Sequence, residues 1–166
     1  MEVIKSAEEI IEGVPKKKYT ESLFYEISLT AKYCKKVGEQ YFKKLNTGLT
    51  TEEFCVLDIT YYEDKKICQR DLALALLVNR ANMGKILDHL EKRGYIKREV
   101  TTKQNRPVKI VILTKEGEDV YIKTLNALRP GIQKMIQFIT NKETDSIIKS
   151  LRRIRQAVKE SIEIDI

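Results

Sequence analysis

Long hydrophobic runs are missing from this 166-residue sequence, since none approaches the ~20 apolar residues that a membrane-spanning helix needs. The first residues, MEVIKSAEEIIEG, carry acidic side chains where a secretion signal has basic residues and then an apolar block. Glycine and proline are scarce, at seven and three residues, which argues against a β-sandwich or barrel. We therefore expect a cytoplasmic, mainly helical protein with no membrane partner.

Residues for metal binding and catalysis are also scarce. The chain has one histidine, His89, which is too few for a zinc-responsive site and is expected at the surface or in a subunit contact. The sequence contains no glycine-rich phosphate loop and no pairing of a nucleophile with a base. We therefore expect neither an enzyme nor a bound metal or cofactor.

The three cysteines have no C-x-x-C spacing and are odd in number, which argues against a disulfide framework. Cys34 and Cys55 lie on or beside apolar helical stripes and are expected to be small core residues. Cys68 has Lys65, Lys66 and Arg70 near it in the sequence, and neighbouring cations favour the reactive thiolate. Cys68 is therefore the candidate for redox sensing.

Positive charge is concentrated in the middle of the chain. The net charge is +7, and residues 64–109 alone contain 12 Lys/Arg and 5 Asp/Glu, so that the remaining residues balance to zero. A localised basic surface is typical of nucleic-acid-binding proteins, the alternative being a solvated surface that happens to be basic.

Residues Gln69–Arg98 have the pattern of a helix-turn-helix. Apolar residues recur at helical spacing in two short segments, Leu72, Ala73, Leu76 and Leu77 in the first and Met83, Ile86, Leu87 and Leu90 in the second. The opposite face of the second segment begins with polar donors, Asn79, Arg80, Asn82 and Lys85, as major-groove reading requires. Gly94 follows at the position of a helix C′ cap.

A β-hairpin is predicted after this unit. Tyr95–Val100 and Pro107–Leu113 have strand character, and the polar tip TTKQNR joins them; Ile67-Cys68 adds a very short strand before the first helix. A basic hairpin that follows a helix-turn-helix is a wing, which reaches a minor groove or a flanking phosphate.

Amphipathic helices flank the basic unit. One is predicted from about Thr20 to Asn46, and a capping box of Thr50 and Glu53 begins another that runs to about Tyr62. Thr114 caps a later helix, which the pair Pro130-Gly131 is expected to kink rather than end.

The last helix follows a second capping box, Thr140 to Glu143. Its apolar stripe is narrow and nearly heptad, and consists of Ile147, Leu151, Ile154, Val158 and Ile162. Such a stripe needs a partner helix, and pairing with a second copy would place two recognition helices about one DNA turn apart. A homodimer is therefore expected.

The order of elements and three sequence segments resemble the MarR family of bacterial winged-helix regulators over about residues 20–160. The segments are Leu72-Ala73, VNRANMGKILDHLEKRGYIKR at 78–98 and NRPVKIVILTKEGE at 105–118. The resemblance implies an obligate homodimer that binds a pseudo-palindromic operator, often as a repressor released by a small phenolic or lipophilic ligand or by cysteine oxidation. The family's Asp-x-Arg wing pattern is absent here, where Asn105-Arg106-Pro107 stands, and Leu77 occupies a turn position often held by glycine. The region in which peroxide-sensing relatives keep their reactive cysteine has none here.

The predicted fold is thus mainly α, an α+β winged helix with about six helices and a two- to three-stranded wing, dimerising through its N- and C-terminal helices. Residues 1–18 are expected to form an arm, and 19–166 a single unit with segments 19–62 (dimerisation and ligand), 63–113 (DNA binding) and 114–166 (dimerisation). The predicted partners are operator DNA, a second copy and a small aromatic or lipophilic effector.

We assign base contacts to Asn82 and Lys85, and phosphate contacts to Asn79 and Arg80 at the helix start. The other predicted DNA contacts are Gln69, Arg70, Lys103, Gln104, Asn105 and Arg106. An effector pocket is predicted from Tyr25, Tyr33, Phe54, Tyr61 and Tyr62, although core packing is the favoured alternative for these aromatic residues. The alternative function is a winged-helix module that binds DNA without sequence specificity or binds another protein.

Overall fold

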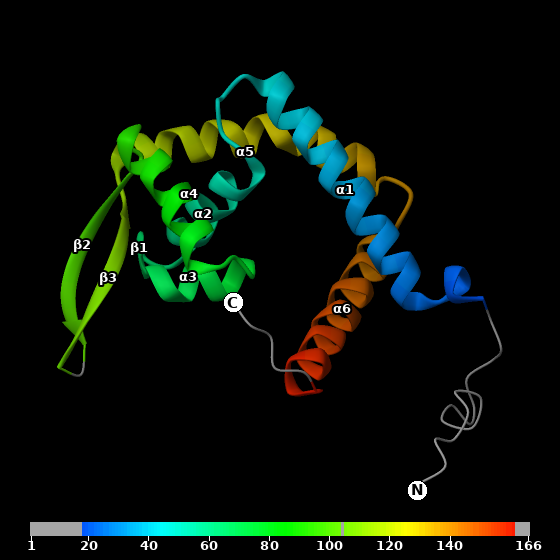
Figure 1. Cartoon of the computed structure of the whole chain (residues 1–166). Coiled ribbons are helices and arrows are strands. Elements are labelled where there is room, and N and C mark those ends of the chain that lie inside the picture. Colours follow the sequence, from blue (N-terminus) through cyan, green and yellow to red (C-terminus); the bar gives the residue numbers. More distant parts are fainter. Residues whose placement is uncertain (1–17, 104, 162–166) are drawn as a thin grey trace, which may run out of the picture. The chain divides into compact units, whose positions relative to one another are not determined.

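The computed structural model describes residues 18–103 and 105–161, and the chain divides into two units, residues 1–38 and 39–166. The predicted arm therefore lies almost wholly outside the described residues. The elements are η1 (Tyr19–Glu21, a 3₁₀ turn), α1 (Leu23–Leu45), α2 (Thr51–Tyr62), β1 (Lys66–Cys68), α3 (Gln69–Leu76), α4 (Arg80–Lys92), β2 (Ile96–Lys103), β3 (Arg106–Leu113), α5 (Lys115–Ile136) and α6 (Asn141–Ser161) (Figure 1). Six α-helices and a small sheet in the described part confirm the predicted fold class.

The sheet is antiparallel, with the strand order β1-β3-β2. Strands β2 and β3 pair from Ile96 opposite Leu113 to Lys103 opposite Arg106, and form the long hairpin that extends from the helices in Figure 1. Only residues 104 and 105 lie between the two strands. The predicted six-residue tip is therefore wrong: residues 101–103 extend β2, because β-branched threonines favour a strand even where they are polar and exposed.

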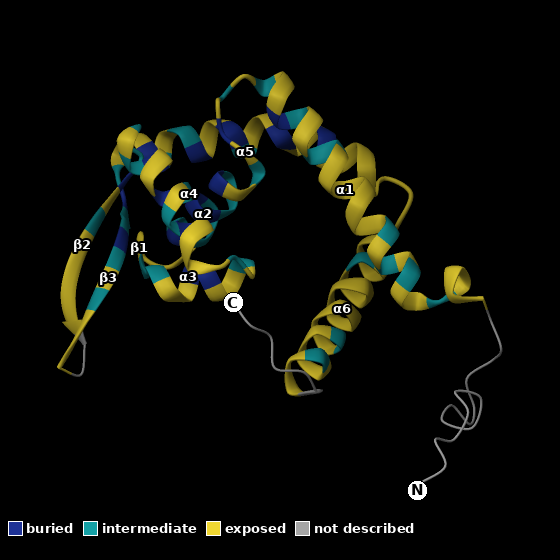
Figure 2. Cartoon of the chain, in the orientation of Figure 1, coloured by how far each residue is buried: buried dark blue, intermediate teal, exposed yellow. Residues whose placement is uncertain are grey.

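One hydrophobic core holds the helix-turn-helix against the sheet and α5. The side chains of Leu57, Leu72, Leu87 and Val111 are fully buried, and Tyr121 is 1% exposed. Figure 2 shows burial concentrated in α2, α4, the base of the sheet and the first half of α5, whereas the wing and α6 are largely exposed. Each buried leucine contributes about 1.5–3 kcal/mol, so this core fixes the position of α4.

The predicted capping boxes begin α2 and α6. The Thr50 hydroxyl accepts the Glu53 N–H at 3.1 Å, and Glu53 Oε2 accepts the Thr50 N–H at 2.8 Å. Thr140 and Glu143 exchange the same pair of bonds, at 3.2 and 2.7 Å. Thr114 caps α5, also as predicted. These reciprocal bonds satisfy donors that a helix start leaves free.

Helix α5 continues through Pro130 to Ile136, as the resumed apolar periodicity predicts. The next residue, Gly131, lies against the end of α1, where an added Cβ would be 2.7 Å from the Cε1 atom of Tyr41. Glycine therefore lets the two helices approach closely. No helix within the described ranges has the length and apolar character to cross a membrane.

Candidate nucleic-acid interface

Helix α4 turns an apolar face to the core and a polar face to solvent. Met83, Leu87 and Leu90 are completely buried. On the other side Asn82 and Lys85 are exposed one helical turn apart. Their side chains can extend outward without losing core contacts, and the amide and ammonium groups match the acceptors and donors of base edges.

Asn79 serves first as the N-cap of α4. Its side-chain oxygen accepts the backbone N–H of Asn82 at 2.9 Å. Sequence reasoning assigned Asn79 to DNA and missed this role, although asparagine is a preferred capping residue. The side-chain NH₂ of Asn79 is left to donate to a phosphate beside Arg80, which is exposed.

The turn between α3 and α4 is made by Leu77 in the left-handed conformation, with φ 51° and ψ 43°. A non-glycine residue in this region costs on the order of 1–2 kcal/mol. The Leu77 side chain is 55% exposed and recovers little of that cost through burial. Glycine at this position would adopt the same conformation without that cost.

Replacing Leu77 with glycine is expected to raise the free energy of unfolding by about 0.5–1 kcal/mol, because relief of the left-handed strain exceeds the added backbone entropy of the unfolded chain. Urea unfolding followed by circular dichroism measures the change. Leu77→Ala is the control, since it removes the side chain but keeps the Cβ. A loss of stability in the glycine variant equal to that in the alanine variant would show that packing of Leu77 outweighs strain.

The start of α3 holds Gln69 and Arg70. Arg70 is exposed, as its predicted phosphate contact requires. Gln69 is half-buried, and its Oε1 atom is shielded from solvent without a hydrogen-bond partner among the described residues. A buried amide oxygen that lacks a donor is unfavourable, and the Gln69 amide nitrogen is the group left to donate to a phosphate.

The wing places Asn105 and Arg106 at its exposed tip. Asn105 has φ 58°, the left-handed conformation that asparagine tolerates in short turns. Gln104 lies outside the described residues, and the side chain of Lys103 is not described either. The structure therefore describes the side chains of two of the four predicted wing contacts, Asn105 and Arg106. Of these two, Arg106 is a cation, and it is exposed.

The base of the wing is tied to α4 by Arg98. Its backbone N–H and Nε donate to the two carboxylate oxygens of Glu91, each at 2.9 Å, and its Nη2 lies 2.7 Å from Asp88. These bonds from Arg98 hold the pKa of the Glu91 carboxyl below its usual range. The sequence showed that the family's wing-tip Asp-x-Arg pattern was missing, and this contact fixes the hairpin from its other end.

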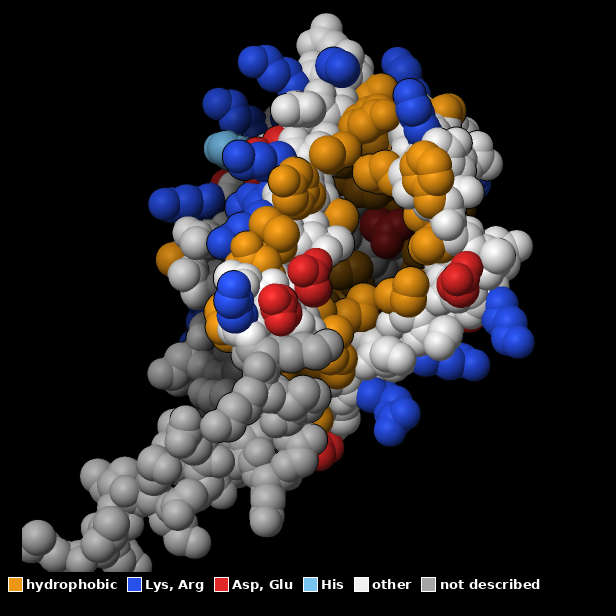
Figure 3. Space-filling view, turned by 90° about the vertical axis from the view of Figure 1, so that its right-hand side faces the viewer, with side chains coloured by type: hydrophobic (Ala, Val, Ile, Leu, Met, Phe, Trp, Pro, Cys, Tyr) orange, Lys and Arg blue, Asp and Glu red, His pale blue; other side chains and the backbone are white. Residues whose placement is uncertain are grey.

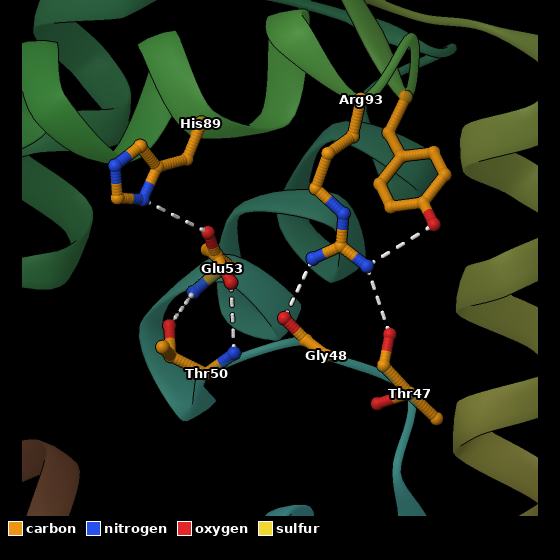
Figure 4. Close-up of polar contacts among 7 residues, drawn as sticks. Thr47, Gly48, Thr50, Glu53, His89 and Arg93 are labelled. Carbon is orange, nitrogen blue, oxygen red and sulfur yellow. Dashed lines mark hydrogen bonds and ion pairs between the residues drawn. The ribbon is translucent and has the colours of Figure 1, made fainter.

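A second arginine, Arg93, connects the end of α4 to the loop before α2 (Figure 4). Its Nη1 donates to the Gly48 carbonyl at 2.6 Å, and its Nη2 donates to the Thr47 carbonyl at 2.8 Å. The guanidinium also stacks over the Tyr95 ring at 4.7 Å. Sequence reasoning missed Arg93, because no local pattern shows that a helix end will meet a loop 45 residues earlier.

His89 lies on the same side of α4 and faces the start of α2. Its Nδ1 is 3.7 Å from Oε1 of Glu53, the buried carboxylate of the capping box (Figure 4). The imidazole itself is 74% exposed. His89 is therefore a surface residue, as predicted.

The predicted pocket aromatics have different surroundings. Phe54 and Tyr61 pack on Tyr121, with ring centres 5.5 and 4.9 Å apart. The Tyr121 hydroxyl donates to Asp58 at 2.8 Å, and burial with this bond raises the pKa of the phenol. Tyr62 is 71% exposed. The remaining two, Tyr25 and Tyr33, belong to the unit formed by residues 1–38.

A hollow of about 490 Å³ lies where α1 ends and α2 begins, and the buried Phe42 and Leu49 contribute to its wall. The five predicted aromatic residues do not line it. It borders the loop whose Gly48 carbonyl accepts from Arg93.

The three cysteines differ in their exposure to solvent. Cys34 is exposed, so its prediction as a core residue is wrong for the single chain; the apolar stripe of α1 is largely unburied there. Cys55 is half-buried, and desolvation, followed by Asp58 and Glu52, raises the pKa of its thiol. Cys68 is half-buried at the N-cap of α3.

Comparison with known proteins agrees with this geometry. The family model described as "MarR family" matches residues 47–106, and no curated protein matches the chain. The fold is similar to that of the regulator BldR from Sulfolobus solfataricus, with 22% identity, TM-score 0.71 and coverage of 85% of this chain and 99% of that one. MepR from S. aureus in complex with DNA has 18% identity, TM-score 0.68 and coverage of 85% and 99%. The organohalide-sensing regulator RdhR in its 2,4-dichlorophenol-bound form has 19% identity, TM-score 0.67 and coverage of 95% and 89%.

Proposed function

We propose that this chain is a winged-helix transcriptional regulator of the MarR family, and that it binds a pseudo-palindromic operator as a homodimer and represses transcription from it. The observation that carries the proposal is the exposed polar face of α4 above a fully buried apolar face. The similar MepR structure contains DNA, which supports the same use of this fold here.

In the proposed complex α4 enters the major groove, and Asn82 and Lys85 contact base edges. The NH₂ group of Asn79, together with Arg80, contacts phosphates at the start of α4. Arg70 and Gln69 contact the backbone from α3, Gln69 through its amide nitrogen. The wing contributes Arg106, Asn105, Gln104 and Lys103 beside the groove.

The proposed dimer uses apolar residues that the single chain leaves exposed. Those in the second half of α5, the following turn and α6 are Ile132, Met135, Ile136, Phe138, Ile139, Ile147, Ile148 and Leu151. Figure 3 shows hydrophobic side chains gathered on the surface that it faces. An exposed apolar area of this extent marks a protein contact. We assign residues 19–62 and 114–166 to dimerisation and 63–113 to DNA binding.

Release of the operator is proposed to follow binding of a small aromatic or lipophilic effector. RdhR has been solved with 2,4-dichlorophenol bound, which supports an effector of this kind. Within residues 39–166 the proposed effector contacts are Phe54, Tyr61 and Tyr62, while Tyr25 and Tyr33 of residues 1–38 stay a sequence-based expectation. Oxidation of Cys68 is the alternative signal, and the DNA affinity of a Cys68→Ser variant before and after mild peroxide treatment tests it.

Substitutions in the reading helix and the wing should have different effects on DNA binding. Arg106→Ala is expected to weaken binding to all sequences together and to reduce the salt dependence by about one unit of log–log slope per protomer. Asn82→Ala is expected to cost about 1–3 kcal/mol at one base position and to relax preference there. Fluorescence anisotropy with operator and mutated duplexes, over a range of salt, measures both.

Lys123→Ala, an exposed cation on α5, is the control for loss of one charge. Wild-type affinity of Arg106→Ala at moderate salt would contradict the wing assignment. Equal weakening of every duplex by Asn82→Ala would instead support the alternative, a module that binds DNA without sequence specificity.

A further inference from the structure

Helix α6 carries a dense basic surface that the winged helix-turn-helix does not include. The eleven residues 149–159 contain five cations and no carboxylate. The cations are Lys149, Arg152, Arg153, Arg155 and Lys159, and all five are exposed. We refer to these five residues as the α6 basic face.

Three cations of the α6 basic face lie beside the apolar stripe of the same helix. At 3.6 residues per turn, Arg152, Arg155 and Lys159 project roughly 100° around the helix from the strip formed by Leu151, Ile154 and Val158. The proposed second copy covers the apolar stripe. These three cations therefore border the proposed contact and are not part of the stripe itself.

Nothing within the described residues neutralises this charge. No ion pair or side-chain hydrogen bond involves any of the five cations among residues 18–103 and 105–161. Arg152 and Arg155 are three residues apart, and Arg155 and Lys159 four, at spacings where like charges on a helix repel. A polyanion bound along the helix would remove this repulsion.

Three of the cations lie on the side of α6 that faces the helix-turn-helix. Arg152, Arg155 and Lys159 line a hollow of about 330 Å³ together with Leu74 and Leu77 of the α3 region. Both helices belong to the unit of residues 39–166. The α6 basic face therefore adjoins the lobe proposed to bind DNA.

We propose that the α6 basic face binds phosphates of the operator DNA, as a second contact surface outside the winged helix-turn-helix. The proposal rests on the proposed DNA-binding function and adds a partner for α6. Flexible Lys and Arg side chains that approach the duplex backbone add affinity through release of counterions, and they add no base preference.

The test compares wild type with the triple variant Arg152→Gln, Arg155→Gln, Lys159→Gln. Glutamine keeps helix propensity and exposed polarity but removes the charge. The probe is a duplex selected for binding to wild type, and its Kd is measured by anisotropy over a series of KCl concentrations. The control triple variant, Lys123→Gln, Arg129→Gln, Lys134→Gln, removes the same charge from exposed positions on α5.

The α6 variant is expected to bind at least about tenfold more weakly near physiological salt, with unchanged base preference. Its log–log salt slope should be shallower by about 0.9 for each phosphate that the variant no longer neutralises. The control should keep a slope close to wild type.

Equal slopes for the two triple variants would overturn the proposal. Dissociation of the α6 variant into monomers would also overturn the proposal, because it would show that the α6 basic face is a subunit contact. Failure of wild type to bind any duplex in a salt-dependent way would instead refute the proposed function.

Discussion

Replacing Gly117 with alanine is expected to destabilise the fold by more than about 3 kcal/mol. Gly117 lies in the first turn of α5, buried against the strand junction at the base of the wing. An added Cβ would be 2.0 Å from the Tyr95 carbonyl oxygen and 2.8 Å from Leu113 Cδ1. Because the nearest atom belongs to the backbone, no side-chain rotation removes the clash.

The chain supplies a matched control in Gly84→Ala. Gly84 lies within α4, and a Cβ there would meet nothing within 4 Å. Alanine stabilises a helix interior relative to glycine by about 0.5–1 kcal/mol, so this variant should become more stable. Urea unfolding of both variants measures the difference. Wild-type stability of Gly117→Ala would show that α5 does not approach the wing base this closely.

Placing a carboxylate on the apolar stripe of α6, as in Leu151→Glu, is expected to break the dimer. Leu151 is 37% exposed and outside the buried core, so the DNA-binding lobe should remain folded. The two-fold symmetry of the proposed dimer places the substitution in the contact twice, and burial of each unpaired charge costs several kcal/mol. Operator affinity should then fall by about a hundredfold or more, since the second half-site no longer benefits from a linked partner.

Ser150→Glu is the control for Leu151→Glu, because it adds the same charge at the neighbouring exposed position, off the stripe. Light scattering after size exclusion gives the mass of each variant, and circular dichroism shows whether the helices persist. A dimeric Leu151→Glu protein with full operator affinity would contradict dimerisation through α6.

Local signals predicted most of this fold because they act within a few residues. The Thr50–Glu53 capping box, the Thr114 cap and Gly94 at φ 73° lie where the sequence placed the helix ends. The β-branched residues of 107–113 likewise predicted a strand there. Each feature depends on side chains that are near in sequence, so no tertiary information was needed.

The sequence did not predict two kinds of feature. One is a contact with residues far away in the sequence, and the other is a side chain that has more than one possible hydrogen-bond partner. The Arg93 guanidinium donates to the carbonyls of Gly48 and Thr47, which lie 45 and 46 residues earlier. No local sequence pattern predicts such a contact. Asn79 carries a donor and an acceptor, and only the structure shows that capping takes the acceptor. Exposed Cys34 had the sequence position of a core residue, because an apolar stripe looks the same whether its own chain or a second copy buries it.

Selection of binding sites from a random pool of duplex DNA tests the central claim most directly. The purified wild-type protein is incubated with the pool at moderate salt, and the retained duplexes are sequenced over successive rounds. The account predicts enrichment of a pseudo-palindrome with half-site centres about 10 bp apart. Retention of DNA without any enriched sequence would contradict the assignment of α4 as a reader of bases.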